Sequence, residues 1–159
     1  MRALLLLAVC GVVGIGIAVA GTPRPGIALD WRIGAVHFDE LKSDVDAVVG
    51  PGEVKRLDRY NGKWIFYRRA GIYVGYVSDR GHKYAFAVVT KSARYRTRSG
   101  IGVGSTLRTL RRGLKVTCDL VDYYTCQDAP ANRNHPFTLF QIDRATRRVT
   151  EVQILPGGD

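Results

Sequence analysis

The stretch with the most chemical potential is SGIGVGSTLRTLRRGLKVTC, in which three glycines precede a leucine-spaced, arginine-rich segment. Such a row could cradle a phosphate, because backbone N–H groups at the start of a helix bind anions. A dinucleotide fingerprint, however, needs a glycine where Ser105 stands, and a P-loop needs a Gly-Lys-Ser/Thr that the sequence lacks. We therefore expect Gly100, Gly102 and Gly104 to shape a turn, with Ser105 or Thr106 capping the helix that follows.

The other reactive residue types do not combine into a catalytic or metal site. His37, His82 and His135 show no metal-ligand spacing, and the sequence has no G-x-S-x-G nucleophile elbow. The aspartates between residues 119 and 128 lack the D-x-D-x-D-G spacing of a calcium loop. We therefore expect a protein that is not an enzyme and that holds no metal or cofactor.

The N-terminus and the cysteines indicate export. Arg2 precedes a long uncharged stretch ending in A-V-A, the pattern of a signal peptide over 1–20 with cleavage after Ala20. The alternative is an uncleaved membrane anchor, because the stretch is just long enough to span a bilayer. Either way the rest of the chain is extracytoplasmic, secreted or membrane-anchored. Cys118 and Cys126 form an even pair, and we expect a disulfide that stabilises the fold by roughly 2–3 kcal/mol.

The formal net charge is +10 at pH 7, and arginines outnumber lysines 18 to 6. Either this bias reflects a GC-rich genome, or a basic face binds an anionic polymer, a lipid surface or an acidic protein. For an exported chain we expect no nucleic acid partner. Arginines alternate in the segment 91–98, as either a solvated strand edge or, if the segment is extended, a cationic strip for polymers or lipid headgroups. Three more lie on the solvated side of a predicted helix. The candidate anion-binding residues are Arg94, Arg96, Arg98, Arg108, Arg111 and Arg112.

An offset of 65 residues aligns apolar positions over most of the sequence. It takes Val36 to Ile101 near the start of the pattern and Val89 to Ile154 near its end. The pattern predicts two diverged copies of one helix-plus-sheet unit. The predicted divisions are a signal peptide at 1–20, a linker at 21–33, the first unit at 34–90, a basic linker at 91–98, the second unit at 99–155 and a tail at 156–159.

Each unit is predicted to open with a short helix and to continue as an antiparallel meander. The helices follow from two apolar stripes, which are Leu41, Val45, Val48 and Val49 with Asp39 as cap, and Leu107, Leu110 and Leu114. Hairpins are predicted for EVKRLDRY and KWIFYRR around Asn61-Gly62, for IYVGYV and HKYAFAVV around SDRG, and for FTLFQI and RVTEVQIL around DRATR. The fold class is therefore α+β.

Strand alternation divides IYVGYV and HKYAFAVV into a small face, expected to pack on a helix, and a bulky face. The bulky face carries Ile72, Val74, Tyr76, Tyr84, Phe86 and Val88. Either the other unit or the linker covers it, or it is exposed and grips a protein partner. Because aromatic anchors dominate protein interfaces, the candidate partner-binding residues in the second case are Tyr76, Tyr84 and Phe86.

VHFDELKSDVDAVVG resembles the V-x-L-G-M-T-x-x-E-V-x-x-L-L-G opening of small helix-plus-sheet modules. Such modules occur in the β-lactamase inhibitor protein and in outer-membrane assembly lipoproteins of the SmpA/OmlA type. GIGVGSTLRTL resembles a second opening, and FTLFQIDRATRRVTEVQI is similar to the modules' closing hairpin. The resemblance implies protein recognition at the envelope, with enzyme inhibition as one form of it. Asp39, Glu40 and Leu41 replace Gly-Met-Thr, only one disulfide can form and there is no lipobox, so no inhibitory or assembly residue is carried over.

We therefore predict an exported, non-enzymatic binding protein that recognises a protein partner at the cell envelope, which requires an exposed aromatic sheet face. The alternative is a cationic domain that associates with an anionic envelope polymer or with lipid headgroups, which requires binding that weakens steeply with salt.

Overall fold

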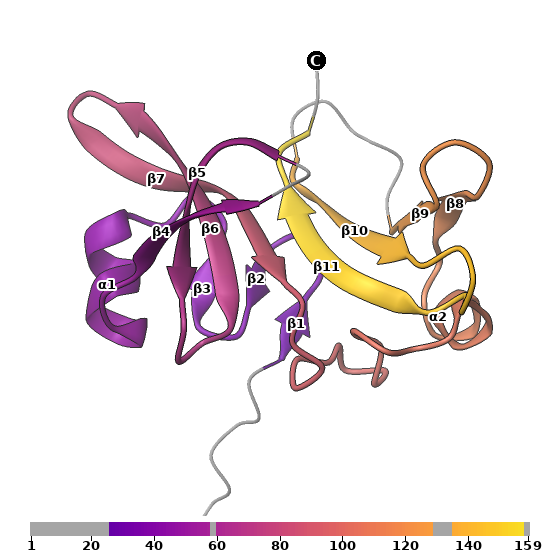
Figure 1. Cartoon of the computed structure of the whole chain (residues 1–159). Coiled ribbons are helices and arrows are strands. Elements are labelled where there is room, and N and C mark those ends of the chain that lie inside the picture. The colour runs from indigo at the N-terminus through magenta and orange to yellow at the C-terminus, as the bar shows by residue number, and fades with distance from the viewer. Residues whose placement is uncertain (1–25, 58–59, 129–134, 158–159) are drawn as a thin grey trace, which may run out of the picture.

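The chain forms an α+β structure of mostly antiparallel sheets and two short helices within the residues that the computed structural model describes, 26–57, 60–128 and 135–157 (Figure 1). No helix in these ranges is long and apolar enough to cross a membrane. The predicted signal peptide and its cleavage after Ala20 lie outside the described residues.

A three-stranded antiparallel sheet comes first, made of β1 (Ile27–Ala28), β2 (Arg32–Ile33) and β3 (Val36–His37). We call it the small sheet. The predicted linker 21–33 therefore contains two strands within its described part. The reason is burial, because the side chains of Ile27 and Ile33 join the main hydrophobic core and order this segment.

An eight-stranded antiparallel sheet follows, in the order β4-β5-β6-β7-β11-β10-β9-β8. Helix α1 (Lys42–Val49) precedes the first four strands and α2 (Leu107–Gly113) precedes the last four. The two four-stranded halves meet where β7 pairs with β11. The strands are β4 (Glu53–Leu57), β5 (Tyr60–Tyr67), β6 (Ile72–Asp79), β7 (His82–Thr90), β8 (Thr117–Asp119), β9 (Thr125–Gln127), β10 (Phe137–Ile142) and β11 (Val149–Leu155).

The two halves also share a pairing register. In β6–β7, Ile72 lies opposite Thr90, and in β10–β11, Phe137 lies opposite Leu155. Adding 65 to each number of the first pair produces the second pair, which is the offset seen in the sequence.

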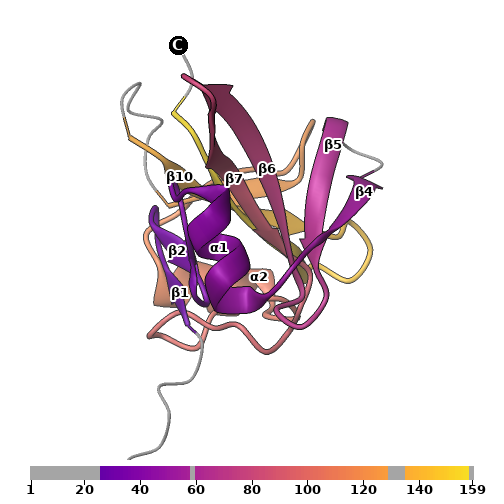
Figure 2. The ribbon, with the colours of Figure 1, turned by 90° about the vertical axis from the view of Figure 1, so that its left-hand side faces the viewer.

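Both helices and the small sheet pack on one face of the large sheet (Figures 1 and 2). In Figure 1 the helices lie at opposite ends, with β1–β3 between them. Val45 of α1 and Leu110 of α2 are fully buried, as their stripes predict. The stripe of α1 is narrower than predicted, because Val48 is 63% exposed. Asp39 does not cap this helix either, since Leu41 is the N-cap residue and makes no side-chain cap.

Hairpin β6–β7 turns at Arg80 and Gly81, both in the left-handed region, within the predicted SDRG. The hairpin β4–β5 exists, but its predicted turn is wrong. Leu57 pairs with Tyr60, so Asn61-Gly62 belongs to β5. The register shifts between Lys55 and Leu57, so an irregularity lies close to the turn. Next to the other end of β4, a Cβ on Gly52 would lie 2.2 Å from Ile65 and 3.0 Å from Tyr67, so these large side chains need a glycine there.

Tyr67 ties α1 to the sheet. Its hydroxyl donates to Oδ1 of Asp46 at 2.8 Å and lies 2.7 Å from the hydroxyl of Tyr76. Burial raises the pKa of Tyr67, with hydrogen bonds to Tyr76 and Asp46 acting in the same direction, and burial also raises the pKa of Tyr76. Both phenols therefore stay protonated in the folded chain at pH values where an unfolded chain ionises them.

We predict that Tyr67→Phe lowers the free energy of unfolding by about 1–3 kcal/mol, because the hydroxyl of Tyr76 loses its partner. Tyr123→Phe is the matched control, since Tyr123 is 73% exposed, and is expected to change stability by less than about 0.5 kcal/mol. Wild-type stability should fall as the pH rises above about 10, where only the unfolded state releases these protons. Urea titrations across that range measure both effects, and a Tyr67→Phe variant as stable as wild type would refute the tie.

A carboxyl pair joins the small sheet to β10. The Thr138 hydroxyl donates to Oδ1 of Asp30 at 2.9 Å, and the Thr138 amide donates to Oδ1 of Asp128 at 3.0 Å. The pKa of Asp128 is raised to about 6, mainly by burial and also by the neighbouring Asp30 carboxyl, while the hydrogen bond from the Thr138 amide acts in the opposite direction. The folded chain therefore keeps this carboxyl protonated up to about pH 6, where an unfolded chain has already ionised it.

We predict that stability falls by about 1 kcal/mol between pH 5 and pH 7.5, after allowing for solvent screening of this partly exposed group. The sign follows because a raised pKa in the folded state favours folding at low pH, and this contribution is lost as the pH passes 6. Asp128→Asn keeps an oxygen for the Thr138 amide and should flatten this dependence in urea titrations. An unchanged slope in the variant would contradict the assignment.

Candidate functional site

One face of the eight-stranded sheet is left without a helix or second sheet among the described elements, and we call it the open face. The main core contains residues of both helices and the small sheet, whereas a second cluster contains only residues of the large sheet. Its buried members include Trp64 and Val89, with Tyr73 and Leu155 packed against them. The open face is therefore the opposite side of the sheet from α1 and α2.

Aromatic side chains occupy the first half of the open face. The Phe66 and Tyr73 rings stack with centroids 4.5 Å apart, and the Trp64 and Phe86 rings lie 6.2 Å apart. Gly75 makes the second contact possible, because a Cβ there would come within 2.8 Å of the Phe86 ring. Phe86 is 38% exposed, so this half presents aromatic surface to solvent.

A β-bulge changes which residues of β6 and β7 share a face. Gly75 pairs with Ala87 but Tyr76 pairs with Ala85, so Phe86 is the extra residue. The predicted grouping of Tyr76 with Tyr84 and Phe86 is therefore wrong for Tyr76. Tyr76 packs against the main core, while Phe86 contacts Trp64 on the open face. Tyr84 is partly buried and lies opposite the half-exposed Val77.

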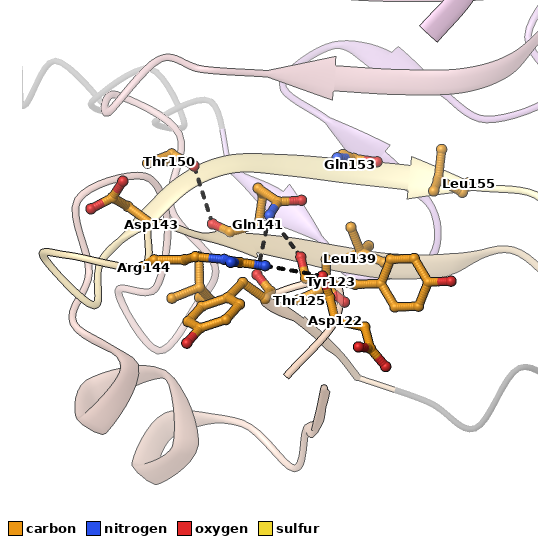
Figure 3. Close-up of a pocket in the computed structure, with 12 residues that line it drawn as sticks. Asp122, Tyr123, Thr125, Leu139, Gln141, Asp143, Arg144, Thr150, Gln153 and Leu155 are labelled. Atoms are coloured by element: carbon orange, nitrogen blue, oxygen red, sulfur yellow. Dashed lines mark hydrogen bonds between the residues drawn. The ribbon is translucent and has the colours of Figure 1, made fainter. Parts of the chain in front are cut away.

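A groove of roughly 760 Å³ continues the open face across β9, β10 and β11 (Figure 3). Leu155 belongs both to this groove and to the second cluster, so the two surfaces are continuous. Gln141 and Gln153 are buried in its floor, and Arg144 and Asp122 line it from the flanking loops. The groove is thus more polar than the aromatic half.

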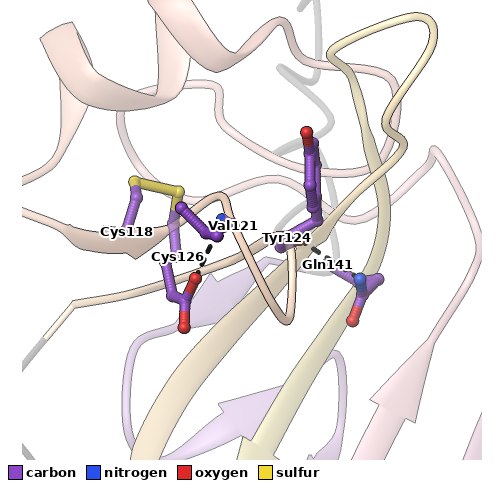
Figure 4. The surroundings of a disulfide bond; sticks show 6 residues. Cys118, Val121, Tyr124, Cys126 and Gln141 are labelled. Carbon is purple, nitrogen blue, oxygen red and sulfur yellow. Dashed lines mark hydrogen bonds between the residues drawn. A yellow bond between two sulfur atoms is a disulfide. The ribbon is translucent and has the colours of Figure 1, made fainter.

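The loop between β8 and β9 forms one wall of the groove. Figure 4 shows this loop beside the disulfide and Gln141. Cys118 and Cys126 lie opposite each other in these strands and form the predicted disulfide, which confirms that prediction. Nε2 of Gln141 donates to the carbonyl oxygens of Tyr123 and Tyr124 at 3.1 and 3.2 Å. The Arg144 guanidinium lies 4.5 Å from the ring centroid of Tyr124. The contacts of Gln141 and Arg144 thus hold the part of the loop just before β9, and the disulfide joins the two strands that flank the loop.

The basic linker is folded and not an extended strip. Arg94 donates to the carbonyl oxygen of Ala70, and Arg96 donates to Oγ of Ser105 at 3.1 Å. These two arginines hold the linker against the fold, so they do not point one way as the alternation suggested. Arg94, Arg96 and the exposed Arg98 nevertheless line one hollow, which Arg32 also lines.

The arginines of α2 are arranged differently. Arg108, Arg111 and Arg112 are exposed and line one hollow of roughly 580 Å³ together with Arg147 from the β10–β11 turn. The structure thus brings the six predicted anion-binding residues together as two groups of three, in two different hollows. Arg147 was missed because its position beside α2 depends on the folding of a distant hairpin.

The glycine-rich stretch is a turn, as predicted. Gly100 and Gly104 have φ values of 78° and 88°, in the left-handed region. A Cβ on Gly102 would lie 2.2 Å from the backbone oxygen of Tyr95, so only glycine fits. Thr106 is the N-cap and its side chain accepts from the amide of Thr109. Within the described ranges, no three His, Cys, Asp or Glu residues lie close enough together to hold a metal ion.

Comparison with known proteins adds no relative. No family model matches the chain, and neither a curated protein nor a solved structure matches it. The candidate binding surfaces are therefore the open face and the arginine-lined hollow beside α2.

We predict that Gln141→Leu frees the β8–β9 loop, because the carbonyl oxygens of Tyr123 and Tyr124 lose their donor. The expected loss is about 1–2 kcal/mol of stability, together with faster amide exchange in residues 120–125. Thr150→Val is the control, since the Thr150 hydroxyl donates only one long hydrogen bond, of 3.4 Å, to the backbone carbonyl oxygen of Gln141. Exchange measured by mass spectrometry checks this, and equal loop exchange in both variants would show that Gln141 does not hold the loop.

Proposed function

We propose that this chain is an exported binding protein that recognises a protein partner at the cell envelope through the open face. The observation that carries the proposal is the row of paired aromatic rings on a sheet face that no described element covers. A large face of this kind usually marks an interaction site. The disulfide supports an oxidising, extracytoplasmic compartment, and we propose secretion or membrane anchoring as the means of export.

The composition of the open face matches that of interface centres. Trp, Tyr and Phe are the side chains that most often carry binding energy, surrounded by polar groups at the rim. Here Phe86 and Val77 are 38% and 50% exposed, while Trp64, whose ring lies beside that of Phe86, is 4% exposed. A partner that covers Phe86 would therefore meet a preorganised surface whose rings already contact one another.

The charges around the open face favour an acidic partner. Lys55 lies with its Nζ 5.6 Å from the ring centroid of Phe66, and Arg144 stands at the edge of the groove. Lys91 lies 3.5 Å from Glu151 and is 57% exposed. With a net charge of +10, the chain attracts an acidic partner electrostatically before contact. The aromatic side chains of the open face then pack against apolar side chains of the partner.

We also propose that the two halves are diverged copies of one unit, which is what the resemblance to tandem helix-plus-sheet modules implies. The shared register of β6–β7 and β10–β11 supports this. So do Asp39 and Gly104, which are 65 residues apart, have left-handed φ values of 63° and 88°, and donate to the carbonyl oxygens of Ala85 and Val149. Asp39 thus stands where the module pattern has glycine. Enzyme inhibition is one form that recognition by such modules would take.

The test compares two exposed aromatic residues on different surfaces. Phe86 is on the open face, whereas Trp31, which is 53% exposed, belongs to the small-sheet side and contacts His37. A partner is captured from envelope extract by the wild-type chain, identified, purified and titrated against each variant. We expect Phe86→Ala to weaken binding about tenfold or more, at high salt as well as low, and Trp31→Ala to leave the affinity unchanged.

A second pair of variants introduces a charge without removing an aromatic ring. Val77→Asp places a carboxylate on the open face, and Val48→Asp places one on α1, where Val48 is 63% exposed. Only the first should weaken binding, because it opposes an acidic partner. Equal losses in the two variants of either pair, or no loss at all, would refute the open face as the binding surface.

A further inference from the structure

The hollow beside α2 gathers positive charge on the opposite side of the sheet from the open face. Arg108, Arg111 and Arg112 reach it from α2, and Arg147 reaches it from the turn between β10 and β11. The backbone joins the two segments, because the amide of Leu107 donates to the carbonyl oxygen of Arg147 at 2.8 Å. The four guanidinium groups are therefore held on one rigid frame.

These arginines have no acidic partner among the described residues, although the Arg147 guanidinium lies 5.8 Å from the ring centroid of Tyr124. No carboxylate of the described residues forms a salt bridge with any of the four. The neighbouring acid Asp143 accepts instead from the amide and hydroxyl of Thr146, both at 2.7 Å, and lines the open-face groove. Arg94 and Arg96, by contrast, donate to oxygens of the fold itself.

The arrangement opposes the stability of the helix. Arg108 is three residues from Arg111 and four from Arg112, the spacings at which like charges repel on a helix surface. Arg111 and Arg112 gain some stabilisation from the carbonyl end of α2, but Arg108 does not. Arg147 adopts a φ of 55°, where glycine or asparagine is favoured. The carbonyl end of α2 and the contact of Arg147 with the Tyr124 ring therefore explain part of the cluster and leave Arg108 unexplained.

We propose that this hollow is a binding site for a phosphate ester, formed by Arg108, Arg111, Arg112 and Arg147. Guanidinium groups bind phosphate oxygens with two parallel charge-assisted hydrogen bonds, which suits arginine better than lysine. The hollow, at roughly 580 Å³, has room for a phosphate together with the group that it esterifies. The ester is carried by a soluble molecule, an envelope polymer or a lipid headgroup. The site goes beyond protein recognition and uses none of the open-face residues.

The test uses the full chain and a triple variant, Arg108→Gln/Arg111→Gln/Arg112→Gln. The matched control is Arg56→Gln/Arg69→Gln/Arg80→Gln, which removes the same charge from exposed positions elsewhere. Pyrophosphate is titrated by calorimetry, and melting is followed with pyrophosphate or with sodium chloride at equal ionic strength. We expect pyrophosphate to raise the melting temperature of wild type and control, and to bind the α2 variant about tenfold or more weakly. Without ligand, the α2 variant should melt higher than wild type, because the repelling charges are gone.

Vesicles distinguish the source of the phosphate. Neutral phosphatidylcholine vesicles are compared with vesicles containing phosphatidylglycerol, so that any contribution of the apolar N-terminus cancels. Selective binding to the anionic vesicles that is lost only in the α2 variant supports the site and assigns it to a lipid headgroup. Pyrophosphate binding lost only in that variant, with vesicle binding unchanged, supports the site and assigns it to a soluble or polymer-borne ester. Equal loss in the α2 and control variants, or no effect of pyrophosphate beyond ionic strength, overturns the proposal.

Discussion

The pairing of β7 with β11 is the contact on which the rest of the structure depends. Three residue pairs join the two four-stranded halves, from Val152 opposite Thr90 to Ile154 opposite Val88. All four of these side chains are fully buried. Because the pairing makes one continuous sheet, the helices and the small sheet share one core on one face, and the aromatic half and the groove form one surface on the other. Without it, each half would be a small sheet with an incomplete core.

Irregularities in the strands then decide which side chains reach the open face. The register shift between Gly75 and Tyr76 places Phe86 beside Trp64. A similar register shift in β10–β11 lies between Gln141 and Ile142. There Val149 packs into the main core and Thr150 lines the groove. The two bulges occupy similar places in the two halves but serve different surfaces, one aromatic and one polar. If the halves are copies of one unit, they diverged most in what their open faces carry.

Features set by local sequence could be predicted, and features set by distant contacts could not. The disulfide, the turn at Arg80 and Gly81 and the buried side of each helix follow from short patterns. The β4–β5 hairpin instead shifts register between Lys55 and Leu57 and places Asn61-Gly62 within β5, although this dipeptide has a strong turn preference. Strand alternation likewise failed at the bulge, because one extra residue reverses the faces beyond it.

The arginines show why net charge alone is a poor guide to binding. One guanidinium nitrogen of Arg94 donates hydrogen bonds to the carbonyl oxygens of Arg69 and Ala70 and to the hydroxyl of Tyr95. These bonds hold the linker against the rest of the fold. The charge of Arg94 is largely committed to the fold. Arg108 forms no salt bridge with a carboxylate of the described residues, so its charge remains available to a ligand. Both count equally toward the net charge of +10, yet only arginines of the second kind can recognise an anion without disturbing the fold.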